Sequence, residues 1–208
     1  MESYRTVGSA GVAEYVDRRS RFIGEARPVA DEAQAAAFIE EMRKKYWDAR
    51  HHVPVYILRA GGVRRFSDDG EPQGTAGMPA LDVLQKQALV DCAVVITRYF
   101  GGILLGGGGL VRAYSHTAAL AIEAAGVVEM RPALVQRIVC SYTQYGWLAA
   151  LVESFGAEVA DTVYTDEVTL TFRIDADKAG SFSAALTDRS AGTLAAETLR
   201  EEYRTVAL

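Results

Sequence analysis

The feature that most constrains this chain is a glycine-rich segment between an apolar run and a long helical pattern. Six glycines fall within residues 101–109. Residues 92–97 before them are apolar and rich in β-branched side chains, which is typical of a central strand covered on both faces. After them, small and apolar residues recur at helical spacing up to Gly126, predicting a helix of about four turns. Glycine is the costliest residue to order, so this run is expected where the backbone turns sharply or approaches something closely.

Two interpretations of the glycine-rich segment remain open. The free amides at the start of a helix favour an anion such as phosphate, whereas a tight strand-to-helix turn needs no ligand. The segment lacks both the Lys-Ser or Lys-Thr of a phosphate-binding loop and the following acid of a dinucleotide site. The candidate anion-binding or nucleic-acid-binding residues are Arg98, Gly101, Gly102, Gly108, Gly109 and Arg112, together with Arg50 and His51.

Composition predicts a cytoplasmic protein of one or two domains. Of the 208 residues, 50% are hydrophobic and 24% are charged, which suffices for one large core or two smaller ones. No run is long enough to span a membrane, and the first residues lack the apolar core of a signal peptide. Cys92 and Cys140 lie in apolar runs without the paired spacing of a metal site, so both are expected in the core.

Charge is distributed unevenly along the chain. The net charge is −5; residues 1–130 hold 15 basic and 16 acidic side chains, a balance of −1, and residues 131–208 hold 7 and 11, a balance of −4. An overall negative charge argues against indiscriminate binding to polyanions, but it can hide a local basic face. Any anion site is therefore expected in the first part.

The first part reads as mixed strands and helices. Residues 1–16 suggest a hairpin that turns at residues 8–11, and residues 22–27 suggest a strand. Asp31 is expected to cap a helix that buries Phe38 and Met42 and carries two i,i+4 ion pairs, Glu40 with Lys44 and Glu41 with Lys45. Residues 53–58 and 63–67, separated by two glycines, predict a β-hairpin.

The segment 67–79 is rich in glycine and proline and is expected to be a long exposed loop before a helix that begins near Pro79. Its acids, Asp68, Asp69 and Glu71, are loop candidates for function. With the nearby histidines they suggest a metal site or a general acid/base pair.

A structural role for these acids is favoured over a metal site or a catalytic role. His51 and His52 would point in opposite directions on a strand, and the oxygen donors lack the spacing of a cation-binding loop. The acids would then cap turns or pair with Arg64 and Arg65. We therefore expect no metal, no cofactor and no catalytic residue.

A second pattern begins after Pro132, which places the domains at residues 1–130 and 131–208. Alternation of Val168, Leu170, Phe172 and Ile174 with polar residues predicts an antiparallel sheet covered by helices on one face. The expected order is βαββαβ, a ferredoxin-like arrangement. The expected strands are 134–140, 158–164, 168–174 and 193–200, and the expected helices are 144–155 and 178–187.

Five short motifs together resemble the IMPACT/YigZ family, whose bacterial members are uncharacterised. They are Arg-Ser-Arg-Phe-Ile at 19–23, Asp-Ala-Arg-His at 48–51, Asp-Asp-Gly-Glu-Pro-Gln-Gly-Thr-Ala-Gly at 68–77, Thr-Arg-Tyr-Phe-Gly-Gly at 97–102 and Gly-Gly-Leu-Val-Arg-Ala-Tyr at 108–114. This sequence has His52 where the family often has Asn, and Gly107 where Ala or Thr is common.

The resemblance implies an α+β fold with two domains. The first would have a mixed sheet with helices, as in the second domain of ribosomal small-subunit protein five, and the second would be ferredoxin-like. Both have counterparts in the last two domains of elongation factor G. Eukaryotic relatives regulate translation by binding the activator of a kinase of initiation factor two, through an added N-terminal domain that this chain is expected to lack. No catalytic residue comes with the family.

Three functional hypotheses follow. The leading one is a non-catalytic cytoplasmic protein that binds RNA or the ribosome and regulates translation. The alternative is an enzyme that binds nucleotide or another phosphate ligand through the glycine-rich segment and the acidic loop. The third is a protein-interaction module whose exposed loop contacts a partner; a protein of translational control is one candidate, and the sequence does not rank the candidates.

Overall fold

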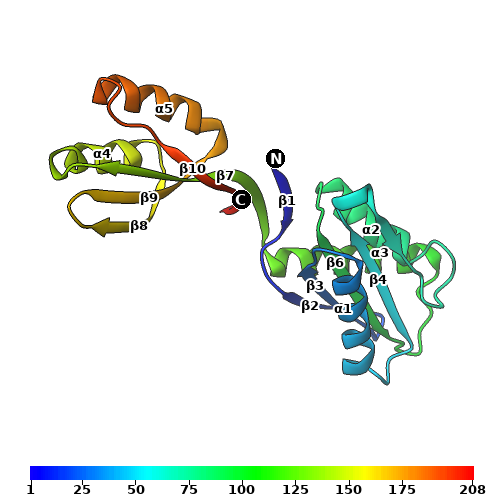
Figure 1. The fold of residues 1–208 in the computed structure, drawn as a ribbon. Coiled ribbons are helices and arrows are strands. Elements are labelled where there is room, and N and C mark those ends of the chain that lie inside the picture. Colours follow the sequence, from blue (N-terminus) through cyan, green and yellow to red (C-terminus); the bar gives the residue numbers. More distant parts are fainter. The chain divides into compact units, whose positions relative to one another are not determined.

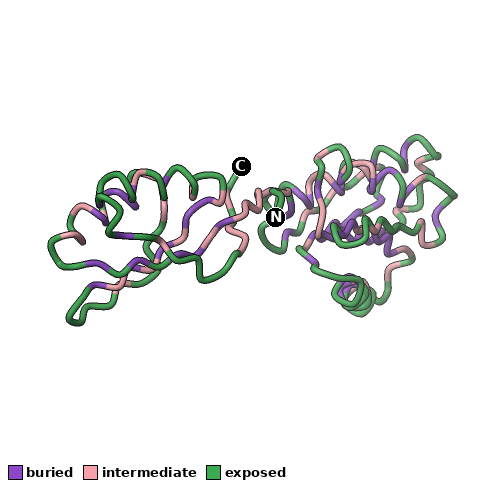
Figure 2. The backbone as a smooth tube through the Cα atoms, turned by 45° about the horizontal axis from the view of Figure 1, so that its top comes forward, coloured by how far each residue is buried: buried purple, intermediate pink, exposed green.

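The computed structural model describes residues 1–208, which form two compact units. The N-terminal unit comprises Tyr4–Glu129 with Val206–Leu208, and the C-terminal unit comprises Met130–Thr205 with Met1–Ser3. Figure 1 shows the chain as a ribbon, and Figure 2 shows that both units contain buried and exposed stretches of the backbone. None of the five helices combines the length and apolar character that crossing a membrane requires.

The N-terminal unit is built on a five-stranded sheet with the order β2-β3-β6-β4-β5. Its strands are β2 (Gly11–Asp17), β3 (Ser20–Pro28), β4 (His51–Ile57), β5 (Arg64–Phe66) and β6 (Cys92–Tyr99). All four pairings are antiparallel, whereas a mixed sheet was expected. The reason is that β6 inserts between β3 and β4, which run in the same direction and would otherwise be parallel neighbours.

Helices cover both faces of this sheet. The helices are α1 (Glu32–Lys45), α2 (Gly77–Lys86) and α3 (Gly107–Ala125), with a 3-10 turn at Ala60–Gly62. Val94 and Ile96 of β6 join the core beneath α2 and α3, and Ala93 and Val95 join the core beneath α1. The prediction of a central strand buried on both faces is confirmed, because β6 is covered in this way.

Most of the predicted elements of this unit are confirmed. Asp31 caps α1 by accepting from the Gln34 amide at 2.8 Å, and the β4–β5 hairpin forms as expected. The two i,i+4 ion pairs on α1 are wrong, because Glu41 instead pairs with Arg27 of the neighbouring strand. Both cysteines are free and buried, as predicted.

The expected hairpin within residues 1–16 is wrong. β1 (Tyr4–Val7) belongs to the other sheet, where it pairs with β7 (Val127–Cys140), and β2 pairs with β3. The glycines serve close packing and not a turn. Gly8 donates its amide proton to the Gly126 carbonyl at 2.7 Å, and a Cβ on Gly11 would lie 2.2 Å from the Ala125 nitrogen.

The C-terminal unit has the predicted βαββαβ order. Its elements are β7, α4 (Tyr142–Ser154), β8 (Glu158–Tyr164), β9 (Val168–Asp175), α5 (Ala176–Ser190) and β10 (Glu197–Ala207). The strand order β10-β7-β9-β8 is ferredoxin-like, and one face packs against α4 and α5 around Phe172 and Phe182. Alternate residues of β9 are buried, as the sequence predicts.

Candidate functional site

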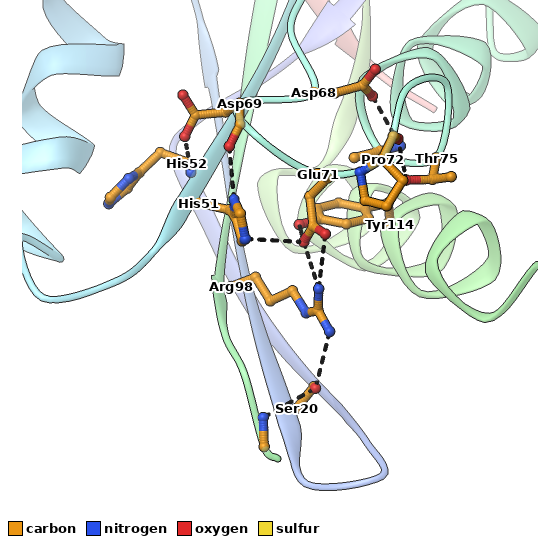
Figure 3. A network of polar contacts seen from close by, with 12 residues as sticks. Ser20, His51, His52, Asp68, Asp69, Glu71, Pro72, Thr75, Arg98 and Tyr114 are labelled. Carbon is orange, nitrogen blue, oxygen red and sulfur yellow. Dashed lines mark hydrogen bonds and ion pairs between the residues drawn. The ribbon is translucent and has the colours of Figure 1, made fainter. Parts of the chain in front are cut away.

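The candidate site lies at the end of β6, where an arginine is buried beside a carboxylate. Arg98 is 6% exposed and Glu71 is 8% exposed. Arg98 donates from Nη1 to both carboxylate oxygens of Glu71, at 2.7 and 2.9 Å (Figure 3). The Tyr114 hydroxyl donates to Glu71 Oε1 at 2.7 Å, so α3 also supports this carboxylate. A buried charge requires such partners, because leaving it unpaired costs several kcal/mol.

The acidic loop is exposed at residues 67, 70 and 72–74, as expected, but Glu71 turns inward and is buried beside Arg98. Asp68 accepts hydrogen bonds from the amides of Gly74, Ala76 and Gly77, at 2.8, 3.1 and 2.8 Å. It thereby satisfies free amides at the start of α2, as a capping residue does. Glu71 is buried as a result, and the expected pairing of the acids with Arg64 and Arg65 does not form.

The two histidines point in opposite directions, as expected for neighbours on a strand. The Asp69 carboxylate accepts from the His52 amide at 2.6 Å, and its carbonyl oxygen lies 2.7 Å from His51 Nδ1. A carbonyl can only accept, so His51 Nδ1 carries the proton. His51 Nε2 then faces Glu71 Oε1 at 4.0 Å, and the acidic loop and His51 therefore meet in space (Figure 3).

The buried ion pair of Glu71 and Arg98 is neutral overall. Burial, reinforced by the hydrogen bond to Glu71, raises the pKa of Tyr114 above its ordinary value. Tyr114 is therefore protonated at neutral pH and acts as a donor. Because Glu71 neutralises Arg98, the guanidinium does not offer the free charge that the sequence suggested for an anion site. No group of three or more His, Cys, Asp and Glu side chains is arranged to hold a metal.

The glycines of the segment 101–109 do different things. A Cβ on Gly101 would lie 2.0 Å from the Arg19 carbonyl carbon, so this glycine allows two backbones to touch. Gly102 has a positive φ of 81° in open space, and it serves the turn. Helix α3 begins at Gly107, and the residue before it, Gly106, has no side chain to cap the helix. The first amides of α3, including those of Gly108 and Gly109, therefore have no side-chain cap.

The start of α3 and the Glu71–Arg98 pair line one pocket of about 330 Å³. Its lining also includes two further side chains of the candidate set, Arg50 and His51, and apolar side chains of the loop before α3. The lining residues are Arg50, His51, Glu71, Pro72, Arg98, Phe100, Leu104, Leu105, Gly106, Gly107 and Leu110.

Arg112 lies outside this pocket. It lines a separate open hollow of about 570 Å³ with Tyr15, Asp17 and His116, among others. Its Nη1 nevertheless reaches back to the first turn of α3, 3.7 Å from where a Cβ on Gly108 would be. The structure thus brings Arg98, Arg50 and His51 into one pocket and leaves Arg112 on the neighbouring surface.

Comparison with known proteins identifies the family. A family described as the Impact N-terminal domain matches residues 18–122, which is half of the chain. The chain belongs to the IMPACT family. A second family, described as a domain of unknown function (DUF1949), matches residues 138–193.

Relatives of the IMPACT family match most of the chain. The "IMPACT family member YigZ" of Escherichia coli (strain K12) is 36% identical over 180 residues, 85% of this chain and 88% of that protein. A crystal structure described as that of "an hypothetical protein" is 33% identical, with a TM-score of 0.60 over 96% of this chain and 98% of the other. "Protein IMPACT" of Xenopus laevis is 33% identical over 96 residues, 43% of this chain and 30% of that protein.

Two members of the candidate site were not predicted as site residues, Tyr114 and Ser20. Ser20 Oγ accepts from the Gly101 amide at 3.2 Å and lies 3.4 Å from Arg98 Nη2. A signal for the network was available in the sequence. Arg98 follows an apolar run expected to be buried on both faces, so it required a carboxylate partner and further acceptors.

Proposed function

We propose that this IMPACT-family chain is a non-catalytic cytoplasmic regulator of translation that binds RNA on the ribosome with the surface at the start of α3. The carrying observation is that Arg50 and Arg112 lie beside the uncapped start of α3, and neither has a carboxylate within ion-pair distance. Free arginines next to unpaired helix amides attract phosphate groups.

Exposed apolar side chains border this surface. Leu104 is 80% exposed, and Phe100 is about half exposed. Trp47, also 80% exposed, belongs to the α1–β4 connection, which Asp48 ties to β6 by accepting from the Tyr99 hydroxyl at 2.7 Å. Single-stranded nucleic acid is commonly bound by such a combination of free arginines and exposed aromatic rings.

The family relationship supports a role in translation. The N-terminal part of the chain is related to the Xenopus protein named IMPACT, and the family resemblance implies that eukaryotic members regulate translation. That relative is matched over 30% of its length, so its partners are not transferred to this chain.

The test is binding of the purified chain to ribosomes and to a single-stranded ribosomal RNA fragment at several salt concentrations. We expect Arg50→Ala with Arg112→Ala to weaken binding and to reduce the slope of log K against log salt by about 1.4, or about 0.7 for each lost phosphate contact. Arg98 is not substituted in this test, because its loss would leave the buried Glu71 carboxylate unpaired.

The matched control is Arg64→Ala with Lys86→Ala. This variant removes the same charge from the same unit, and Arg64 lies opposite Ile57, at the other end of β4 from His51. We expect it to bind as the unchanged chain does. Equal weakening in both double variants would show that binding depends only on net charge and would contradict the proposed surface. Binding that does not change with salt concentration would refute the proposal.

A further inference from the structure

The pocket beside the start of α3 shares Arg50, Phe100 and Leu104 with the surface proposed for RNA, but its volume and apolar walls suit a small molecule. Its volume of about 330 Å³ is at the lower end of small-molecule sites and corresponds to a ligand of roughly ten heavy atoms. Phe100, Leu104, Leu105 and Leu110 supply apolar walls. These walls suit the apolar body of a small molecule.

The charge of the lining residues indicates the charge of the polar group that such a ligand would carry. Glu71 and Arg98 neutralise each other, and the Tyr114 hydroxyl occupies a further acceptor position on Glu71. Arg50 remains as an exposed cation without a carboxylate partner. The uncapped start of α3 adds partial positive charge at Gly106 and Gly107. The lining therefore carries a net positive charge.

One buried atom of Arg98, a residue that lines the pocket, has no hydrogen-bond partner. Arg98 Nε is buried and lacks a hydrogen-bond acceptor, although both terminal nitrogens of the guanidinium are engaged. The half-exposed Phe100 ring lies against this guanidinium, with its centroid 5.5 Å from Cζ. A buried donor without an acceptor is rare, and an oxygen reaching past Phe100 would satisfy it.

We propose that this pocket binds a small amphipathic oxyanion, a carboxylate or phosphate monoester on an apolar body. The apolar body lies against Phe100 and the leucines. The anionic head lies between Arg50, the first amides of α3 and the edge of the Arg98 guanidinium. The pocket shares Arg50 and the start of α3 with the surface proposed for RNA, and titration with small molecules in the absence of RNA tests it separately.

The test is titration of the full ¹⁵N-labelled chain with four probes, followed by NMR. The probes are 3-phenylpropionate, phenyl phosphate, the neutral 3-phenylpropanamide and inorganic phosphate. We expect the first or second to shift amides of residues 98–110, with the amide and the inorganic ion binding at least about tenfold more weakly, the value of one charge-assisted hydrogen bond. The stronger of the two anions identifies the head.

Two variants locate the parts of the ligand. Arg50→Ala should weaken the anions about tenfold and leave the neutral amide unchanged, whereas Phe100→Ala should weaken both alike. Arg64→Ala is the control and should change neither. Equal binding of acid and amide, shifts confined to other residues, an unchanged affinity in Arg50→Ala, or no binding of either anion up to about 10 mM would overturn the proposal.

Discussion

Replacing Glu71 by Gln tests the buried ion pair that organises the site. The side chains of Glu71 and Arg98 are 3% and 7% exposed, and two hydrogen bonds below 3 Å join them. Glutamine keeps the shape and an acceptor for Tyr114 but leaves the Arg98 charge uncompensated. Breaking a pair this deeply buried costs about 3–5 kcal/mol, whereas an exposed pair contributes about 0–1 kcal/mol.

The assay is hydrogen exchange of the β6 amides, which reports the N-terminal unit alone. A loss of about 3 kcal/mol should accelerate their exchange by about a hundredfold where these amides exchange by opening of the whole unit. Adding Arg98→Met to Glu71→Gln should recover part of the loss, because the stranded charge is then gone. The control is Glu197→Gln, which breaks an exposed pair with Arg137 and should leave β6 exchange unchanged. An acceleration below about tenfold would refute the reasoning.

Three further predictions concern neighbouring residues. Because the pKa of Tyr114 is raised in the folded chain, its contribution to stability is complete below about pH 10 and is lost as pH rises through its folded-state pKa; the alkaline loss measured by urea unfolding should be shallower in Tyr114→Phe by up to about 1.4 kcal/mol per pH unit. An equal slope in both proteins would contradict this. Gly101→Ala should destabilise the N-terminal unit in thermal unfolding because its methyl group meets the Arg19 backbone. Gly108→Ala should stabilise it by about 0.5–1 kcal/mol, because its methyl group would meet only Arg112 Nη1, at an ordinary contact distance of 3.7 Å; the opposite order would be inconsistent with the structure. Asp68→Ala should cost about 1–2 kcal/mol and speed amide exchange at the start of α2, and unchanged exchange there would rule out the capping role.

Much of the fold follows from local patterns in the sequence. The alternation in β9 fixes which residues face α4 and α5, and Asp31 marks the start of α1. Both signals are local, because strand alternation and helix capping depend on residues a few positions apart. The resemblance to the IMPACT family implied which fold each domain has, and the family match confirms that the chain is a member.

The errors arise where distant segments decide the structure. Gly8 and Gly11 have the spacing of a turn. In the structure, however, the absence of a side chain lets their backbone contact the end of α3, more than 110 residues later in the sequence. Asp68 and Glu71 look like loop acids, but one caps the start of α2 and the other neutralises a buried arginine. Local propensity carries no information about such partners.

The candidate site was predicted in part. Arg50, His51 and Arg98 do converge on one pocket, and the acidic loop reaches it. The sequence could not show that Glu71 would neutralise Arg98, nor that Arg112 would lie on the adjacent surface. The pairing of Glu71 with Arg98 depends on how the loop before α2 reaches β6, which is a tertiary contact without a repeating pattern.

The most direct test of the proposed function is a hydrogen-exchange footprint of the chain bound to ribosomes. If the start of α3 is the binding surface, protection on binding should appear in residues 98–112 and in the α1–β4 connection around Arg50. The peptides of α4 and α5 in the C-terminal unit should exchange as in the free chain. Protection confined to the C-terminal unit, with residues 98–112 unchanged, would contradict the account.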